Sequence, residues 1–323
     1  MTATFAQTLT SRLVRSAIGA AISVAVLGVA GYTLYELLHG IEFDKVLAAL
    51  YSQSVQRLVV AGVFVIAAYV ALTFYDVFAL HVIGRQKVPY SVAALASFTS
   101  STIGHNLGAA ILTGGMIRLR IYSVWGLTVA DVAKIAVLTG ITFWLGNAFL
   151  LGMTAAYIPE AATAVDHFPR WLNRGMGFAG LFGIACYLMW LAPAPRAFGR
   201  AGWRIELPNF RQTLLQIGVG TLDLILVTLA MYALLPTTPV IGLPNLTVVF
   251  LTAMLLGTVS HAPAGLGVIE ATMLLGLPQY PREALLATLL TFRALYFLLP
   301  LFLATLALGI RELRILARAA KSR

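Results

Sequence analysis

Long uninterrupted apolar runs dominate the chain, and six of them are long enough to cross a membrane. A helix needs roughly 20 apolar residues to span about 30 Å of hydrocarbon. Such runs lie at residues 16–38, 58–83, 132–157, 174–193, 212–235 and 284–309. We expect the first to remain in the mature protein, because its apolar run of about 22 residues is too long for a signal peptide. The pattern predicts six transmembrane helices.

Two further apolar stretches, Ser91–Ile117 and Leu246–Gly276, are interrupted midway by polar and glycine-rich residues. The interruptions lie within SFTSSTIGHNLGAAILTGG and LLGTVSHAPAGLGVIEATMLLG. Because unpaired backbone cannot face lipid, a broken helix at membrane depth must be buried in protein or line a wet cavity. Both stretches are therefore predicted to be re-entrant helical hairpins, with His105 and His261 in the breaks.

The composition is that of an integral membrane protein. Of the 323 residues, 60% are apolar and 11% charged, and the mean hydropathy is +0.89. Soluble domains are about 45–50% apolar and about 25% charged. We therefore predict an all-α, polytopic fold with a single transmembrane domain over residues 1–323. The net charge of +10 does not indicate nucleic-acid binding, because the basic residues fall between apolar stretches.

Basic residues gather on alternate connecting segments and predict the orientation. One side holds Arg12, Arg15, Arg85, Lys87, Arg118, Arg120, Arg196, Arg200, Arg204, Arg211 and the basic residues from Arg311 to Arg323. The other side holds Lys45, Arg57, Arg170, Arg174 and Arg282, partly offset by Glu42, Asp44, Glu160, Asp166 and Glu283. The positive-inside rule places the first side, and both termini, in the bacterial cytoplasm.

The order of elements also predicts an internal repeat. Residues 10–165 and 166–315 each hold two spans, a broken hairpin and a third span. Three crossings per half require the second half to be inverted, an arrangement typical of secondary transporters. The second span, the hairpin break and the third span each carry an ionisable residue. These are Asp76, His105 and Lys134 in the first half and Asp223, His261 and Arg293 in the second.

Ionisable residues inside the apolar segments need a physical reason, since each costs roughly 2.5–3.5 kcal/mol at a helix centre. Asp76, Asp223 and Arg293 lie within spans, and Glu270 lies within the second hairpin. Asp76 and Asp223 either pair with basic groups to fix the helix packing or take part in transport. For Glu270 and Arg293 we favour a shared buried pair that shapes the wall of a cavity.

The two hairpin histidines have two interpretations. His105 and His261, together with the free N–H groups of the breaks, are suited to bind a polar lipid headgroup at a helix end. Alternatively, each imidazole satisfies carbonyl groups left unpaired at its own kink. A metal site is not expected, because no second ligand stands at a suitable spacing and Cys186 is the one cysteine.

Glycines and arginines stand together at the end of the first hairpin. Gly114 and Gly115 permit close backbone approach to a ligand, and the guanidinium groups of Arg118 and Arg120 match phosphate oxygens. Two residues apart on a helix, the two arginines face nearly opposite directions. One is expected to face a cavity while the other reaches lipid phosphates. Alternatively, the positive-inside rule by itself accounts for one of the two.

Signatures of enzymes are missing from the sequence. No histidine begins an HExxH motif, the second aspartate of an intramembrane aspartyl protease is replaced by Val268, and there is no G-x-S-x-G or P-loop. We therefore expect no catalytic residues and no cofactor.

Several motifs resemble one known family. The stretches GHNLGAAILTGGMIRLRIYSVWGLT, VSHAPAGLGVIE and TFRALYFLLPL, with an aspartate on the span before YALLP, are similar to the transmembrane flippase domain of lysylphosphatidylglycerol synthase, the multiple peptide resistance factor. The resemblance covers roughly residues 10–315. The family usually has Pro-Gly-Gly-Leu-Gly where this chain has Pro263-Ala264-Gly265-Leu266-Gly267. The chain stops at Arg323, so the synthase domain of bifunctional members is not expected.

The resemblance implies a lipid flippase or lipid transporter in the bacterial inner membrane, acting on an anionic or aminoacylated phospholipid. Matched to the motifs, the residues expected to line or shape the lipid cavity are His105, Asn106, Gly114, Gly115, Arg118, Tyr122, His261, Pro263, Gly265, Gly267, Glu270 and Arg293. Alternatives are an ion-coupled carrier of a small solute, a non-transporting partner of a separate lipid-modifying enzyme, and a membrane-embedded transferase, against which the sequence argues. Glycines at 175, 177, 180 and 183 are compatible with a homodimer or with packing within one chain.

Overall fold

The computed structural model describes residues 35, 42–107, 110–192, 196–200 and 203–321. In chain order the helices are α2 (Phe43–Tyr51), α3 (Val55–Val82), α4 (Tyr90–Leu107), α5 (Ala110–Tyr122), η1 (Ser123–Trp125), α6 (Val129–Tyr157), α7 (Pro159–Asp166), α8 (Arg170–Leu191), α9 (Phe210–Leu234), α10 (Leu243–Val259), η2 (Pro263–Gly265), α11 (Val268–Gly276), α12 (Arg282–Arg293), η3 (Ala294–Leu298) and α13 (Leu299–Lys321). A short antiparallel hairpin, β1 (Ala197–Arg200) and β2 (Trp203–Glu206), joins α8 to α9 and was not predicted.

Five of the six predicted spans are confirmed as long apolar helices. Within the described residues these are Val55–Val82, Val129–Tyr157, Arg170–Leu191, Phe210–Leu234 and Arg282–Arg314. The predicted span at 16–38 lies outside the described residues, apart from Tyr35. The chain is therefore an all-α polytopic membrane protein.

The spans begin a few residues earlier than predicted because polar capping residues, and not the first apolar residues, set their ends. The Ser54 side chain accepts a hydrogen bond from the Arg57 backbone N–H at the start of α3. Thr128 forms a reciprocal capping box at the start of α6, and Asn209 does the same at the start of α9. Such caps satisfy N–H groups that have no partner within the helix.

Both interrupted stretches form pairs of short helices. The first consists of α4 and α5, which pack against each other, and the second of α10 and α11, which are joined through η2. The first break comes later than predicted: α4 continues to Leu107, so His105 lies in its last helical turn and not in the break. The second break falls at 260–267, as predicted.

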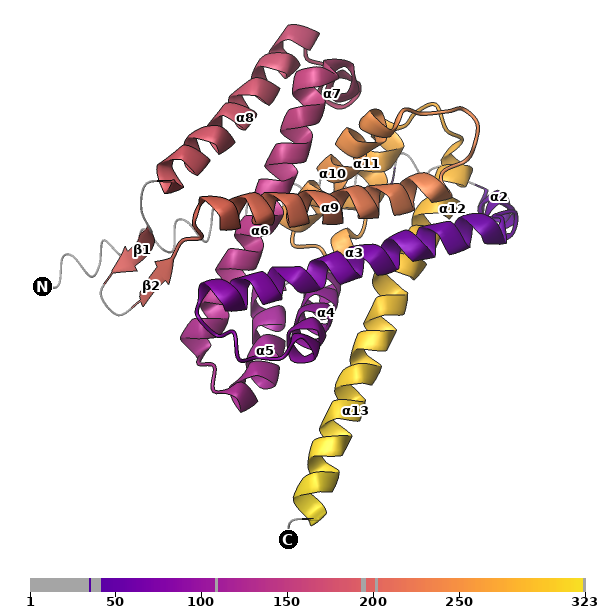
Figure 1. Cartoon of the computed structure of the whole chain (residues 1–323). Helices are drawn as coiled ribbons and strands as arrows, with labels where there is room; N and C mark the ends of the chain where they lie inside the picture. Colours follow the sequence, from indigo (N-terminus) through magenta and orange to yellow (C-terminus); the bar gives the residue numbers. More distant parts are fainter. Residues whose placement is uncertain (1–34, 36–41, 108–109, 193–195, 201–202, 322–323) are drawn as a thin grey trace, which may run out of the picture.

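The centre of the molecule is built on the antiparallel pair α3 and α9, which lie side by side (Figure 1). Arg57, near the start of α3, donates to the carbonyl of Leu235 just after α9, at 3.5 Å. Further along, the Tyr75 hydroxyl donates to Asp223 in the middle of α9, at 3.0 Å. These helices hold corresponding places in the two halves, so their antiparallel packing agrees with the predicted inversion. The repeat boundaries themselves stay a prediction.

The last span contains a π-helical turn, η3, directly before Pro300. Proline has no N–H, so the carbonyl of Tyr296 lacks its usual helical donor. The Tyr69 hydroxyl of α3 donates to this carbonyl at 2.9 Å, and the Asn106 side chain of α4 donates to the carbonyl of Phe297 at 3.3 Å. The irregular turn is thereby attached to both neighbouring helices.

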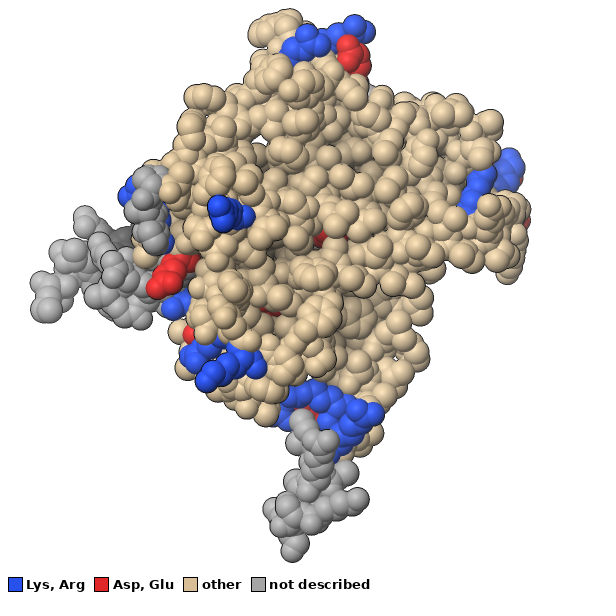
Figure 2. Space-filling model, in the orientation of Figure 1, with Lys and Arg blue, Asp and Glu red and all other residues tan. Residues whose placement is uncertain are grey.

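Charged side chains occur mainly at the two ends of the bundle, and the face between them is largely uncharged (Figure 2). At one end, here called the basic end, Arg85 pairs with Asp131 at 3.0 Å and Arg120 pairs with Glu312 at 2.8 Å. These contacts bring α3, α5, α6 and α13 together. At the opposite end, Arg170 lies 3.4 Å from Glu160. The positions of Arg85, Arg120 and Arg170 agree with the predicted division, whereas Arg118, predicted with the first group, is buried. That the basic end is cytoplasmic stays a prediction.

Glycines permit two close helix crossings. A Cβ atom added at Gly220 of α9 would lie 2.5 Å from the backbone oxygen of Thr142 in α6. One added at Gly177 of α8 would lie 2.4 Å from the backbone nitrogen of Ala156. Gly177 therefore serves packing within the chain, whereas Gly175, Gly180 and Gly183 have no atom within 4 Å of such a Cβ. The homodimer stays a prediction.

The crossing of α6 and α9 gives a stability prediction. Gly220→Ala should destabilise the protein by about 1–3 kcal/mol, because the new methyl group meets backbone that cannot move aside. Gly218→Ala is the control: it lies in the same helix, no atom lies within 4 Å of the added Cβ, and the gain in helix propensity is the same. Thermal unfolding in detergent should show a lower midpoint for Gly220→Ala alone. Equal midpoints for the two variants would contradict the close crossing.

Candidate functional site

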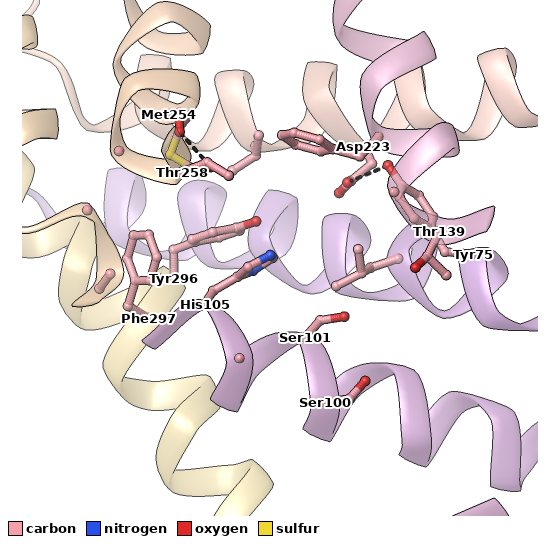
Figure 3. A pocket seen from close by; sticks show the side chains of 18 of the residues that line it. Tyr75, Ser100, Ser101, His105, Thr139, Asp223, Met254, Thr258, Tyr296 and Phe297 are labelled. Carbon is pink, nitrogen blue, oxygen red and sulfur yellow. Dashed lines mark hydrogen bonds between the residues drawn. The ribbon is translucent and has the colours of Figure 1, made fainter. Parts of the chain in front are cut away.

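A cavity of about 310 Å³ lies between the two interrupted stretches (Figure 3). One wall comes from α4 and α5, the other from α10, η2 and α11, and the remainder from α3, α6, α9 and η3. Its polar and ionisable lining residues are Tyr75, Ser100, Ser101, His105, Arg118, Thr139, Asp223, Thr258, His261 and Tyr296. A cavity therefore lies between the two broken helices as predicted, with polar groups set in a largely apolar lining; the hydrophilic seam stays a prediction.

The cavity lies at the depth of the membrane-spanning segments. In α6 it is lined from Ala136 to Trp144, which are about 10 and about 22 Å from the start of the helix at 1.5 Å per residue. In α9 it is lined by Asp223, about 20 Å from the start. Both helices start at the basic end, so the cavity extends from that half of the bundle to its middle.

One side of the cavity is open to the outside of the bundle. Trp144 of α6 lines the cavity and is 51% exposed, and Thr258 and His261 across from it are also exposed. Leu266 beside the second break is exposed as well. The exposed lining residues at this opening are thus both apolar, as Trp144 is, and polar, as Thr258 and His261 are.

A buried ion pair forms one end of the cavity. The Arg118 guanidinium binds the Asp76 carboxylate through Nε at 3.0 Å and Nη2 at 2.8 Å, and the Tyr122 hydroxyl donates to the same carboxylate at 2.8 Å. All three residues are buried. Of the two interpretations given for Asp76, its contacts match the structural one: an acid paired with a base from the first hairpin.

The two arginines of α5 face different directions, as expected from their spacing. The side chain of Arg118 is buried and lines the cavity, whereas that of Arg120 is 69% exposed. Arg120 pairs with Glu312 of α13, which also binds Arg311 at 2.9 Å. Arg120 is therefore at the surface of the basic end and outside the cavity.

Asp223 has a different environment from Asp76. It lies in the middle of α9, is 6% exposed, lines the cavity and accepts a hydrogen bond from Tyr75 at 3.0 Å (Figure 3). In the described part of the chain, no Lys, Arg or His forms an ion pair with it. The prediction that intramembrane acids pair with bases therefore holds for Asp76 and not for Asp223.

His105 projects into the cavity near Tyr296 and Phe297 (Figure 3). Its side chain is accessible from the cavity, and no group among the described residues hydrogen-bonds its ring. His261 differs, because its Nδ1 lies 2.8 Å from the carbonyl of Val259 at the end of α10. The interpretation in which a histidine satisfies carbonyls at its own kink thus fits His261 and not His105.

The second break is held in a left-handed backbone conformation. His261, Ala264, Gly265 and Gly267 all have positive φ. Glycine adopts this conformation freely, whereas Ala264, with φ 51°, carries a cost of roughly 1–2 kcal/mol. The family that the motif resembles usually has glycine at this position. The alanine of this chain therefore carries a conformational cost that glycine would not.

The predicted pair of Glu270 and Arg293 is confirmed, and it holds the second break in place. Glu270 accepts from the backbone N–H of Gly267 at 2.8 Å and binds Arg293 Nε. Arg293 also donates through Nη1 to the carbonyl of Ala264 at 3.0 Å. Ala264 and Gly265 line the cavity while the ion pair lies behind them, so the pair shapes the wall.

The structure separates the predicted site residues into two groups. Those that line the cavity are His105, Arg118, His261, Gly265 and Asp223. Those that lie outside the lining are Asp76, Asn106, Gly114, Gly115, Tyr122, Pro263, Gly267, Glu270 and Arg293. Gly114 has a structural reason, since a Cβ there would lie 3.0 Å from the carbonyl oxygen of Ser100. No atom lies within 4 Å of a Cβ added at Gly115, so nothing in the described structure explains a glycine there.

Several lining residues were missed by sequence reasoning. Tyr75 stands next to Asp76, and its hydroxyl is what contacts Asp223. On α6, Ala136, Thr139 and Gly140 form a face of small residues at helical spacing, which is the signal that could have placed this helix at the cavity. The aromatic residues of η3 gave no signal, because aromatic residues are common throughout the apolar segments.

Comparison with known proteins supports the membrane assignment. The chain is 31% identical over 303 residues to the uncharacterized protein slr0712 of Synechocystis sp., covering 94% of this chain and 92% of that protein. The chain belongs to the family of this Synechocystis protein. It is also 29% identical over 250 residues to the inner membrane protein YbhN of Escherichia coli K12, covering 74% and 75% of the two chains. No family model matches the chain.

Double substitution tests the role of the buried pair. Arg293→Met leaves Glu270 without its cation in an apolar environment, which should cost about 3–5 kcal/mol, and Glu270→Gln should also destabilise. The double variant should lose less than the sum of the single losses, because neither charge is then left alone. Unfolding midpoints in detergent measure all three.

The exposed pair of Arg170 and Glu160 supplies the control. Their side chains are 74% and 48% exposed, so Glu160→Gln should change the unfolding free energy by less than about 1 kcal/mol. Strictly additive losses at Glu270 and Arg293 would show that the two residues do not act as a pair.

Proposed function

We propose that this protein moves the polar headgroup of a phospholipid across the bacterial inner membrane by way of the cavity between its two broken hairpins. The observation that carries the proposal is the form of the cavity: polar and ionisable groups take part in its lining, and exposed lining residues such as Trp144 lie at the depth of the membrane-spanning helices. A lipid can enter such an opening with its headgroup inside and its acyl chains still in the bilayer.

The chemistry of the lining suits a phosphate-bearing headgroup. Arg118 uses Nε and Nη2 for Asp76, and its Nη1 donors remain for a ligand, since guanidinium has five N–H donors in all. Ser100, Ser101 and His105 line the same part of the cavity. These groups would hydrogen-bond phosphate oxygens, while the aromatic residues of η3 would contact the glycerol and upper acyl carbons.

Two likenesses support the proposal. The motifs of both hairpins resemble the flippase domain of lysylphosphatidylglycerol synthase, and one relative carries the name inner membrane protein. The broken helices meeting at the midplane also match the general construction of secondary transporters. The protein is accordingly proposed to act as a transporter without an enzymatic step and without a cofactor, with its basic end in the cytoplasm.

Leaflet exchange in reconstituted vesicles tests the proposed function. Vesicles of phosphatidylglycerol and phosphatidylethanolamine would carry trace fluorescent analogues of each lipid, and a membrane-impermeant quencher would report which leaflet they occupy. We expect the protein to accelerate exchange of at least one analogue severalfold over protein-free vesicles. Equal rates with and without protein, for both analogues, would refute lipid movement and favour a solute carrier or a non-transporting partner of an enzyme.

A cavity-blocking variant gives the matched comparison. Ser101→Trp fills the cavity from α4 and should lower the exchange rate at least tenfold, whereas Ser91→Trp places the same side chain on an exposed turn of the same helix and should leave it unchanged. Unfolding midpoints of the two variants check that both are folded. Equal exchange by two folded variants would exclude this cavity as the route.

A further inference from the structure

Asp223 is the ionisable group of the cavity that the proposed function does not explain. Its carboxylate lies at the middle of a membrane-spanning helix, is almost completely buried and accepts one hydrogen bond, from Tyr75. The other buried intramembrane acids are neutralised within the chain, Asp76 by Arg118 and Glu270 by Arg293. Asp223 has no such partner among the described residues.

An ionised carboxylate in this position is expensive. Burying a charge without a counter-charge costs several kcal/mol even after the protein relaxes, and one neutral hydroxyl donor offsets a small part of that. Binding a proton removes the charge and leaves a carboxylic acid that can still hydrogen-bond Tyr75. The carboxylate is hydrogen-bonded by one phenol, that of Tyr75, and such a pair is suited to binding a proton.

We propose that Asp223 is a proton-binding site that couples movement of the cavity's ligand to movement of one proton. The inference rests on the proposed transport function and adds its energy source. In the proton-binding step, the carboxylate of Asp223 takes a proton from water in the cavity and becomes a neutral acid. In the release step it returns the proton to water on the other side of the membrane.

The groups that face Asp223 come from several elements. From α3 it is faced by Tyr75 and Tyr69, and from η3 by Tyr296. Across the cavity lie His105 of α4, Arg118 of α5 and His261 after α10, while α6 presents no ionisable side chain to the cavity. Arg118 is the one permanent cation among them, and it is bound to Asp76. The groups facing the cavity that can exchange protons with its water are therefore Asp223 and the two histidines.

Coupling follows from the cost of the unpaired charge. While the cavity is open, water can solvate an ionised Asp223. Closing the cavity removes that water, so closure is favourable only when Asp223 is protonated or is paired with a cationic amine of the lipid headgroup. An empty cavity must then carry a proton each time it reorients, and a proton gradient drives the cycle.

Infrared difference spectroscopy tests the proton site without any knowledge of the lipid. Spectra of the purified full chain in lipid would be recorded between about pH 5 and about pH 9, spanning the range where an ordinary Asp is already ionised. We expect the wild-type protein to show a carboxylic-acid carbonyl band that titrates in this range and is lost in Asp223→Asn. The band should remain in Asp44→Asn, which makes the same change at an exposed position of α2. The absence of a band specific to Asp223 would overturn the proposal.

A transport measurement then tests the coupling. In the vesicles described above, an imposed pH gradient should shift the leaflet distribution of the transported analogue at least twofold for the wild-type protein and for Asp44→Asn. Asp223→Asn should lose this shift, and the infrared band of the same variant shows whether the proton site is lost with it. A shift that persists in Asp223→Asn, or that requires a sodium gradient, would overturn proton coupling.

Different results would refute the proposed lipid movement and the proposed proton coupling. If the wild-type protein exchanges neither analogue, lipid movement is refuted, and the infrared band alone then decides whether Asp223 binds a proton. If exchange occurs and no gradient alters it in the wild-type protein, transport stands and the coupling is refuted.

Discussion

The structure depends on one constraint: polar groups at membrane depth must find partners within the protein, because hydrocarbon offers none. Each irregular segment shows how the requirement is met. Tyr69 supplies the donor that Pro300 cannot, and Arg293 binds the carbonyl of Ala264 in the second break. Broken helices are stable here because neighbouring spans provide side chains at these positions. The backbone around the cavity therefore has partners for these otherwise unpaired carbonyl groups.

The same constraint separates structural charges from the charge available for function. Asp76 with Arg118 and Glu270 with Arg293 are satisfied within the chain and support the ends of the two hairpins. Their contacts leave little capacity to bind a ligand, apart from the remaining donors of Arg118. Asp223 and His105 face the cavity without such partners, so the groups free to change state during a transport cycle belong to this second set.

Much of the fold could be predicted from the sequence, because span length and broken apolar runs follow directly from the thickness of the bilayer. The pair Glu270–Arg293 was also predictable, since two opposite charges in apolar segments need each other. The partner of Asp76 was not, because a choice between Arg118 and Lys134 depends on how helices rotate about their axes. The position of His105 was misjudged because helix α4 continues through a polar stretch whose side chains bond to its own backbone, as Asn106 does to Thr102. The cavity face of α6, made of small residues, carries no chemical signal of its own.

The two predicted halves differ in how charge is distributed, and this difference has a functional consequence. In the first half, the aspartate of the span pairs with an arginine of the hairpin. In the second, the acid of the hairpin pairs with an arginine of the following span, which leaves the span aspartate, Asp223, with a tyrosine from the other half. If both halves used the pairing of the first, every buried charge would be neutralised and the cavity would have no titratable carboxylate. Among the described residues that line the cavity, Asp223 is therefore the titratable carboxylate, and it lies between α3 and α9, where a change in the relative position of these helices would alter its exposure to water.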